Sequence, residues 1–272
     1  MTEPEVRSDL LLRLESFYDA VPRQGARAEL IGPLVLFVRE GAGWPYYARP
    51  VRPDVQVSGD DVRDVLGRMD ELGVPHQLEW VNDLTPSLAQ AVQDAGLTLQ
   101  LCPLMVLEPA DLVVLDAPGV SVSVMDADDP DLALADACAH VAFGAGIGTA
   151  VGEGGVAERD ASAAELDPAR VERLRAGIRS GEQVRAVART DVGPVASGGY
   201  QHAAGVAEVV GIGTLPISRR RGIGAALAGV LAREAFARGE HTVFLSAQDE
   251  DVARVYERAG FRRTGTSGIA EP

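Results

Sequence analysis

An apolar stretch in the last quarter of the chain leads into a turn rich in arginine and glycine, and a run of helix-forming residues follows. The turn reads Arg219-Arg-Arg221-Gly222-Ile-Gly224. Glycine lets the backbone approach a ligand closely, and the unpaired N–H groups of a first helical turn favour an anion. One exposed contact of this kind contributes only about 0.3–1 kcal/mol. We therefore expect several N–H groups and an arginine to bind a multiply charged phosphate together.

Length and charge narrow the classes of partner. With 272 residues, 46% of them hydrophobic, the chain can form one large domain or two small ones, and we expect two. The formal net charge of −15 argues against nucleic acid or an anionic membrane as the main partner, because both bind dense positive charge. All 25 basic residues are arginine, which excludes acylation of a lysine side chain of the protein itself.

Cysteine spacing and the N-terminal segment exclude several other classes. Cys102 and Cys138 are isolated, so neither a disulfide framework nor a zinc site is indicated, and we expect no metal. Both are predicted to be buried. Residues 1–12 lack the pattern of a secretion signal, and no apolar run reaches the ~18 residues of a membrane span. The expectation is a cytoplasmic protein.

The spacing of apolar residues predicts helices and strands along the whole chain. Helices are predicted over 5–20, 60–72, 86–95, 129–141, 168–178, the residues after Gly224, and 250–259. Strands are predicted over 33–39, 77–81, 99–107, 120–125, 184–189, 195–200, 207–215, 242–246 and after Phe261. The proline-rich, acidic segment 108–119 is the predicted connection between two domains, with the boundary near residue 115.

One short repeat is visible. The segment Leu88-Ala-Gln-Ala-Val92-Gln-Asp-Ala-Gly96-Leu97 aligns with Val252-Ala-Arg-Val-Tyr256-Glu-Arg-Ala-Gly260-Phe261, and each follows a strand-like run. Matching strand–helix–glycine units indicate a duplicated architecture. A glycine-capped amphipathic helix is common, so chance similarity is the alternative.

Two motifs in order carry a resemblance to a known family. Thr214-x-Pro216-x-x-Arg219-x-x-Gly222-x-Gly224 precedes Ala253-x-x-x-Tyr256-x-x-x-Gly260-Phe261 by some thirty residues. This combination resembles the GNAT acyl-CoA N-acyltransferase superfamily over roughly residues 120–268. The resemblance implies an α/β (α+β) fold with a mixed central sheet flanked by helices. Residues 116–272 would be the catalytic acetyltransferase domain, and residues 1–115 a degenerate GNAT-like domain in tandem.

The resemblance also implies that acetyl-CoA is the cosubstrate. Its pyrophosphate would lie on the turn, and its pantetheine would pair with the preceding strand. The residues so assigned are Ile212, Gly213, Thr214, Arg219, Arg220, Arg221, Gly222, Ile223, Gly224 and Ala225. A bulge is the alternative explanation for Gly211 and Gly213 within a strand. Leu227 replaces the third glycine of a dinucleotide fingerprint, so the turn is not predicted to bind NAD.

Two residues are candidates for catalysis. Tyr256 falls on the position of the family's general acid, and Glu208 on that of a glutamate that relays the amine proton. The alternatives are a core tyrosine beneath Phe261 and a solvent-facing glutamate. The counterpart of Tyr256 in the first half is Val92, which carries no acidic proton, so that half is expected to be catalytically silent. By resemblance, the N–H of Thr214 would stabilise the oxyanion.

The predicted activity is transfer of an acetyl group from acetyl-CoA to a primary amine by direct attack. A non-catalytic acyl-CoA-binding sensor is the alternative, and nucleotide binding at the turn is a second. The acceptor would be a small-molecule or peptide amine, and the acidic composition slightly favours a cationic one. The sequence does not decide whether the protein forms a homodimer.

His202 and the aromatic cluster around Trp44 are weaker candidates for the functional site. We expect His202 to be solvated and the aromatic cluster to pack within a loop.

Overall fold

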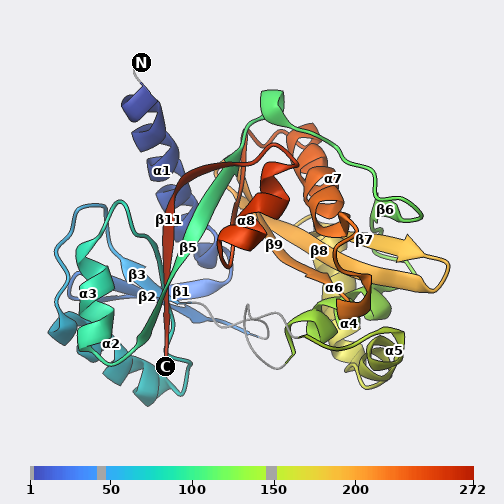
Figure 1. The fold of residues 1–272 in the computed structure, drawn as a ribbon. Helices are drawn as coiled ribbons and strands as arrows, with labels where there is room; N and C mark the ends of the chain where they lie inside the picture. The colour runs from blue at the N-terminus through green and yellow to red at the C-terminus, as the bar shows by residue number, and fades with distance from the viewer. Residues whose placement is uncertain (1–2, 42–46, 145–151) are drawn as a thin grey trace. The chain divides into compact units, whose positions relative to one another are not determined.

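A computed structural model describes residues 3–41, 47–144 and 152–272 (Figure 1). The chain folds into two compact units, residues 1–104 with 263–272, and residues 105–262. The division differs from the expected boundary near residue 115. The last ten residues belong to the first unit because their strand hydrogen-bonds to a strand of that unit.

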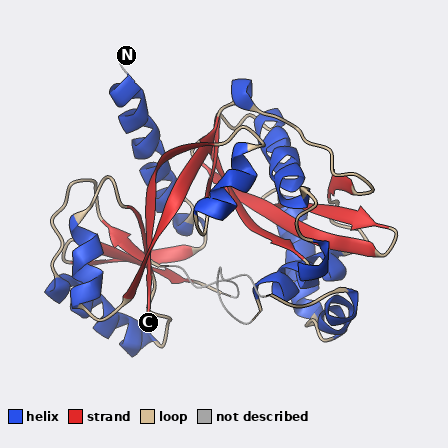
Figure 2. Ribbon diagram, viewed as in Figure 1, coloured by secondary structure: helices blue, strands red, loops and turns tan. Residues whose placement is uncertain are grey.

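The first unit contains a mixed sheet with helices packed against it (Figure 2). Its elements are α1 (Glu3–Ala20), η1 (Pro22–Gln24), β1 (Ala26–Ile31), β2 (Leu34–Arg39), β3 (Ala48–Pro50), α2 (Gly59–Leu72), β4 (Leu78–Val81), α3 (Ser87–Asp94), most of β5 (Thr98–Leu107) and β11 (Arg262–Glu271). The strand order is β1-β2-β3-β4-β11-β5, and the β3–β4 pair is parallel.

Local sequence explains how α2 forms. Ser58 and Asp61 form a reciprocal capping box at its start, and Gly73 ends it in the left-handed conformation, with φ of 64°. Its apolar residues share one face and are buried against the sheet: Val62, Val65, Leu66 and Met69. The predicted helix over 60–72 and its glycine cap are confirmed.

The second unit contains a mixed sheet in the order β10-β9-β8-β7-β6. Its elements are η2 (Pro109–Asp111), β6 (Ser121–Val124), α4 (Leu132–Phe143), α5 (Val156–Ala164), α6 (Pro168–Ser180), β7 (Val184–Thr190), β8 (Gly193–Ala203), β9 (Val206–Thr214), η3 (Pro216–Ser218), α7 (Ile223–Ala237), β10 (Thr242–Ser246) and α8 (Glu250–Glu257). The β9–β10 pair is parallel, and the pairs from β6 to β9 are antiparallel.

Helices cover both faces of this second sheet (Figure 1). The apolar helix α7 packs on one face, against alternate strand residues such as Tyr200 and Val209. The other face lies under α4, where the hydroxyl of Ser197 donates a hydrogen bond to the carbonyl of Ala135. Successive residues along β8 and β9 therefore face α7 and α4 in alternation.

The repeat seen in the sequence has a matching backbone structure. Gly96 after α3 and Gly260 after α8 both have positive φ, 90° and 97°. In each case the next residue donates its N–H to the carbonyl five positions earlier, Leu97 to Val92 (3.0 Å) and Phe261 to Tyr256 (3.3 Å). Each half of the chain thus contains a strand, a short helix, a glycine closure and a further strand, although β11, the strand that follows Gly260, belongs to the first unit.

The elements β1, β3 and α5 were not predicted. The strand β1 is mostly exposed and lacks a clear apolar alternation, and β3 has only three residues. The helix α5 follows a glycine-rich segment and starts at Gly155, whose N–H is bound by the side chain of Glu158 (2.7 Å). A glycine N-cap gives little signal, because serine, threonine, aspartate and asparagine are the usual marks of a helix start.

We predict opposite effects for two glycine substitutions in the first unit. Gly268 faces Trp80 across the β4–β11 pair, and a Cβ there would lie 2.4 Å from the indole. Gly268→Ala should therefore destabilise the protein by about 1–3 kcal/mol through overpacking. Gly67 is exposed within α2, with no atom within 4 Å of an added Cβ, and Gly67→Ala should stabilise by about 0.5–1 kcal/mol. Urea denaturation measures both, and equal effects would contradict this packing.

Candidate functional site

The strands β9 and β10 separate part-way along their length. Their parallel ladder runs from the Thr242–Val206 pair to the Phe244–Glu208 pair. Beyond it, β9 continues to Thr214 and β10 to Ser246 without further paired residues. The backbone edge of β9 beyond Glu208 is therefore available to an extended ligand.

A bulge lies on the other edge of β9. Between the Ser197–Gly213 and Gly199–Val210 pairs, β9 has one residue more than β8. Gly211 within this bulge has φ of 62°, a conformation that glycine adopts without strain. The bulge that we gave as an alternative is present at Gly211, whereas Gly213 stays paired with Ser197. It bends β9 in the region where β9 and β10 have parted.

The amide of Thr214 points away from β8. The N–H of Leu215 donates to the carbonyl of Val195 (2.9 Å), which makes those residues a hydrogen-bonded pair. Hydrogen-bonded and non-hydrogen-bonded pairs alternate in an antiparallel ladder, so Ala196–Thr214 is a non-hydrogen-bonded pair. The Thr214 N–H is thus directed to the side on which β9 has separated from β10.

The turn before α7 places backbone N–H groups at the helix start. Arg220 and Gly222 have positive φ, 65° and 78°, and Gly222 is the N-cap without a side-chain capping bond. The first helical bond is donated by Ala226 to the carbonyl of Gly222 (3.1 Å). Three N–H groups precede that bond, those of Ile223, Gly224 and Ala225. Such a start attracts anions.

The three arginines of the turn differ in orientation. Arg219 is turned inward and donates to the carbonyls of Thr214 (3.2 Å) and Ala142 (3.1 Å), and burial lowers its pKa. It therefore holds the turn against β9 and α4. Arg220 and Arg221 are exposed, and their guanidinium groups can meet a charged ligand, although one nitrogen of Arg221 donates to the carbonyl of Pro118 (3.4 Å).

The predicted residues of β9 and the turn converge on α8 and α4. A Cβ at Gly224 would lie 3.8 Å from Ile212 Cγ2 and 3.7 Å from Val255 Cγ1 of α8. A Cβ at Gly213 would lie only 2.7 Å from Ala139 Cα of α4. Glycine at 213 thus allows α4 to pack directly on β9.

Tyr256 lies in the last turn of α8. Its ring contacts Phe261 edge-on, with ring centroids 6.1 Å apart, and burial raises its pKa to about 12. The packing under Phe261 that we gave as the alternative to an acid role is therefore present. This packing does not exclude that role, because no described residue hydrogen-bonds the hydroxyl.

Glu208 is buried at the point where β9 and β10 separate, with 6% of the residue exposed. The alternative of a solvent-facing strand residue is therefore wrong. Gln201 of β8, its partner in the ladder, donates a side-chain hydrogen bond to Glu208 Oε2 (2.8 Å). Both side chains lie on the α4 face of the sheet, because Gln201 follows Ser197 by an even number of residues and ladder partners share a face.

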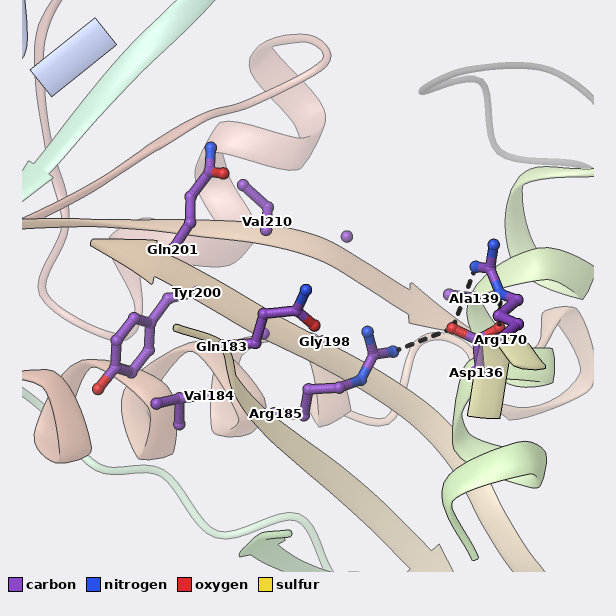
Figure 3. A pocket seen from close by; sticks show the side chains of 12 residues that line it. Asp136, Ala139, Arg170, Gln183, Val184, Arg185, Gly198, Tyr200, Gln201 and Val210 are labelled. Atoms are coloured by element: carbon purple, nitrogen blue, oxygen red, sulfur yellow. Dashed lines mark hydrogen bonds and ion pairs between the residues drawn. The ribbon is translucent and has the colours of Figure 1, made fainter. Parts of the chain in front are cut away.

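A cavity of about 300 Å³ opens on this same face (Figure 3). It is lined by residues of α4, α6, β7, β8 and β9, including Gln201 and Val210. Figure 3 shows Arg170 and Arg185 directed to Asp136 from two sides. These three charged residues were not predicted from the sequence. Arg185 within the apolar run of β7 was the available signal.

Two weaker candidates have structural roles. His202 lies within β8, not in a turn, and its ring nitrogens contact Glu240 Oε1 (3.0 Å) and the carbonyl of Gly181 (2.9 Å). The side chain is 36% exposed, so it is partly solvated as expected, but both ring nitrogens have partners in the protein. Trp44 lies outside the described residues, and Tyr47 of the same cluster donates its hydroxyl to the carbonyl of Tyr18 (3.1 Å).

Further features concern metals, membranes and cysteines. Within the ranges that the structure describes, no group of three or more His, Cys, Asp or Glu side chains is placed to hold a metal ion. No helix among the described residues has the length and apolarity of a membrane span. Cys102 and Cys138 are buried, as predicted, and neither forms a disulfide, and burial raises the pKa of Cys138 to about 12.

Comparisons with known proteins find a family match within the second unit. The acetyltransferase (GNAT) family model matches residues 157–261. The chain is similar to a GCN5-related N-acetyltransferase from Kribbella flavida, with 25% identity and a TM-score of 0.70 over 96% of this chain and 95% of that one. No curated protein matches the chain.

Two further solved structures share the fold at lower identity. One is a GCN5-related N-acetyltransferase-like protein from Streptococcus suis, with 12% identity and a TM-score of 0.57 over 97% of this chain and 98% of that one. The other is a tandem GNAT protein from the clavulanic acid biosynthesis pathway, with 13% identity and a TM-score of 0.53 over 88% of this chain and 78% of that one.

These matches agree with the mixed sheets and with the paired strand–helix–glycine units described above. The family supports an acyltransferase activity with an acyl-CoA cosubstrate. The expected α/β fold, with a central mixed sheet flanked by helices, is confirmed. The chain therefore carries a GNAT acetyltransferase domain at residues 157–261, and its N-terminal half is GNAT-like in structure.

Proposed function

We propose that the second unit transfers an acetyl group from acetyl-CoA to the primary amine of an acceptor. The observation that carries this proposal is the separation of β9 from β10 at Glu208, inside a domain of the GNAT family. An edge of unpaired backbone at this position suits the amides of a pantetheine arm, which would pair with β9 as an added strand does.

The turn before α7 would hold the pyrophosphate. The N–H groups that precede the first helical bond are the donors, and the exposed Arg220 and Arg221 add positive charge. Arg219 acts indirectly in this proposal, because its guanidinium already binds the carbonyls of Thr214 and Ala142. The residues present therefore fit a diphosphate ligand.

The chemistry requires a proton acceptor, a donor to the oxyanion and a proton donor. Acetyl-CoA supplies the acetyl group as a thioester. Glu208 would accept the amine proton, directly or through water, as the C–N bond forms. The Thr214 N–H would donate to the oxyanion, and Tyr256 would give its proton to the sulfur as the C–S bond breaks. A phenol with a pKa of about 12 is a weaker acid than a thiol with a pKa of about 8.5, so this transfer must accompany bond breaking.

The first prediction concerns ligand binding. Acetyl-CoA and coenzyme A should raise the melting temperature, because a ligand at 100 times its Kd adds about 2.7 kcal/mol, whereas ATP and NAD should not. Arg220→Glu and Arg221→Glu should each weaken coenzyme A binding on the order of 10-fold through lost charge-assisted bonds. Arg233→Glu changes the same charge on an exposed residue further along α7 and should leave binding unchanged. No shift with either coenzyme A compound would refute the proposal.

The second prediction separates an enzyme from an acyl-CoA sensor. Tyr256→Phe keeps the ring beside Phe261 and removes only the hydroxyl. Release of free thiol in the presence of an accepted amine should fall on the order of 10²–10⁴-fold, while the Kd for coenzyme A stays the same. An unchanged rate would remove Tyr256 as the acid. Binding of acetyl-CoA without turnover of any amine would favour the sensor.

The third prediction concerns pH. Burial disfavours the phenolate of Tyr256 and raises its pKa to about 12, so the hydroxyl stays protonated throughout the range in which the assay can be run. The profile of kcat should therefore show no loss of activity from Tyr256 ionisation between pH about 7 and about 10. A basic limb in this range that disappears in Tyr256→Phe would contradict the raised pKa of the hydroxyl.

A further inference from the structure

We propose that the acceptor is an elongated amino acid whose carboxylate binds Arg185 in the cavity under α4, while its amine reaches the point where β9 and β10 separate. This inference rests on the proposed acetyltransferase function and adds the substrate class. The acidic composition of the whole chain favours a cationic acceptor. The cavity lining, in contrast, is positively charged and favours an acceptor that carries a carboxylate.

The charge balance within the cavity carries the argument. Asp136 is 5% exposed and is bound by Arg170 through two hydrogen bonds, of 2.8 and 3.2 Å. Arg185 approaches the same carboxylate only to 3.6 Å, beyond hydrogen-bond distance. One carboxylate therefore faces two guanidinium groups, and the lining has one uncompensated positive charge.

Arg185 has donors to spare. Only 17% of its side chain is exposed, and its buried Nε has no hydrogen-bond partner among the described residues. Desolvation lowers its pKa, Arg170 adds to that effect, and Asp136 opposes it. Buried guanidinium groups are normally paired with an anion, and their planar fork fits a carboxylate with two parallel bonds.

The remaining lining fits an extended, partly apolar chain. Gly198 and Gly199 leave the middle of β8 without side chains, and the partly exposed Val210 offers an apolar contact. Glu208 of β9 accepts a hydrogen bond from Gln201, one of the lining residues. The cavity thus extends from Arg185 to Gln201, and Gln201 connects its lining to Glu208 by a hydrogen bond.

Strand geometry gives the length of the acceptor. Arg185 pairs with Gly199, and Gly199 pairs with Val210, two residues beyond Glu208. Two strand spacings of about 4.8 Å place the cationic end roughly 10 Å from the edge of β9 where β10 has parted. An α-amino acid is too short to reach both ends. A chain with its carboxylate several bonds from its amine can do so.

The test uses a ladder of linear ω-amino acids from glycine to aminooctanoate, each paired with the n-alkylamine of the same chain length. Thiol release from acetyl-CoA should rise with length and be greatest for aminohexanoate to aminooctanoate. The kcat/KM of these amino acids should exceed that of their alkylamines at least 10-fold. Equal or better turnover of the alkylamines would overturn the inference while leaving the acetyltransferase proposal intact.

Two substitutions with opposite expected signs separate binding from folding. Arg185→Gln should raise the KM for aminooctanoate on the order of 10–100-fold, and the KM for octylamine, which has no carboxylate, should stay the same. Asp136→Asn removes the competing carboxylate and should lower KM for aminooctanoate. Arg175→Gln is the control, because Arg175 lies on α6 and contacts Ala127 and Asp128 outside the cavity lining. Equal losses in both cavity variants would indicate a purely structural cluster and overturn the inference.

Calorimetric titration of aminooctanoate into the protein saturated with coenzyme A gives a readout without turnover. Binding that is lost in Arg185→Gln and tightened in Asp136→Asn supports the carboxylate site. Absence of binding while coenzyme A still binds refutes the site alone. Absence of coenzyme A binding refutes the proposed function first.

Discussion

The separation of β9 from β10 at Glu208 is the feature on which the site depends. A paired strand presents no free backbone groups, so a ligand can join the sheet only where a ladder ends. Here the ladder ends inside the sheet, and the neighbouring residues maintain the opening. The bulge at Gly211 bends β9, and Arg219 fixes the end of β9 to α4 through two carbonyl groups.

The other parts of the site lie around the place where β9 and β10 separate. The chain leaves β9 at Thr214, passes through η3 and reaches the uncapped start of α7 within a few residues. Glu208 lies at the point of separation, and the cavity adjoins it on the α4 face. A ligand lying along β9 would therefore have its anionic end at α7, and its other end would lie between Glu208 and the cavity.

The two units contain the same local backbone structure with chemically different side chains at one equivalent position. The helices α3 and α8 end in the same glycine closure, with the same hydrogen-bond pattern. The equivalent residues are Val92, fully buried in the first core, and Tyr256, whose hydroxyl has no hydrogen-bond partner among the described residues of the second. The backbone pattern is compatible with both residues because it involves only main-chain groups. Of the two side chains, only that of Tyr256 carries the hydroxyl proton that the proposed reaction would use.

Much of the fold and part of the candidate site could be predicted from the amino-acid sequence. The turn before α7, the glycine-capped helices and most strands follow from local rules that act over a few residues, such as positive φ at glycine and periodic burial. The strand β1 and the helix α5 were missed because their local patterns are weak. The partners of His202 were missed because Glu240 and Gly181 are distant in the chain.

The sequence by itself determined the strand–turn–helix unit, the tyrosine at the end of α8 and the tandem arrangement, since each depends on neighbours along the chain. Only the tertiary structure decided where the ladder between β9 and β10 ends, that Arg219 faces inward, and that Asp136, Arg170 and Arg185 meet in one cavity. These features depend on the register between strands and on helices packed across them. Contacts between residues 34 or more positions apart, as between Asp136 and Arg170, leave no periodic trace in a single sequence.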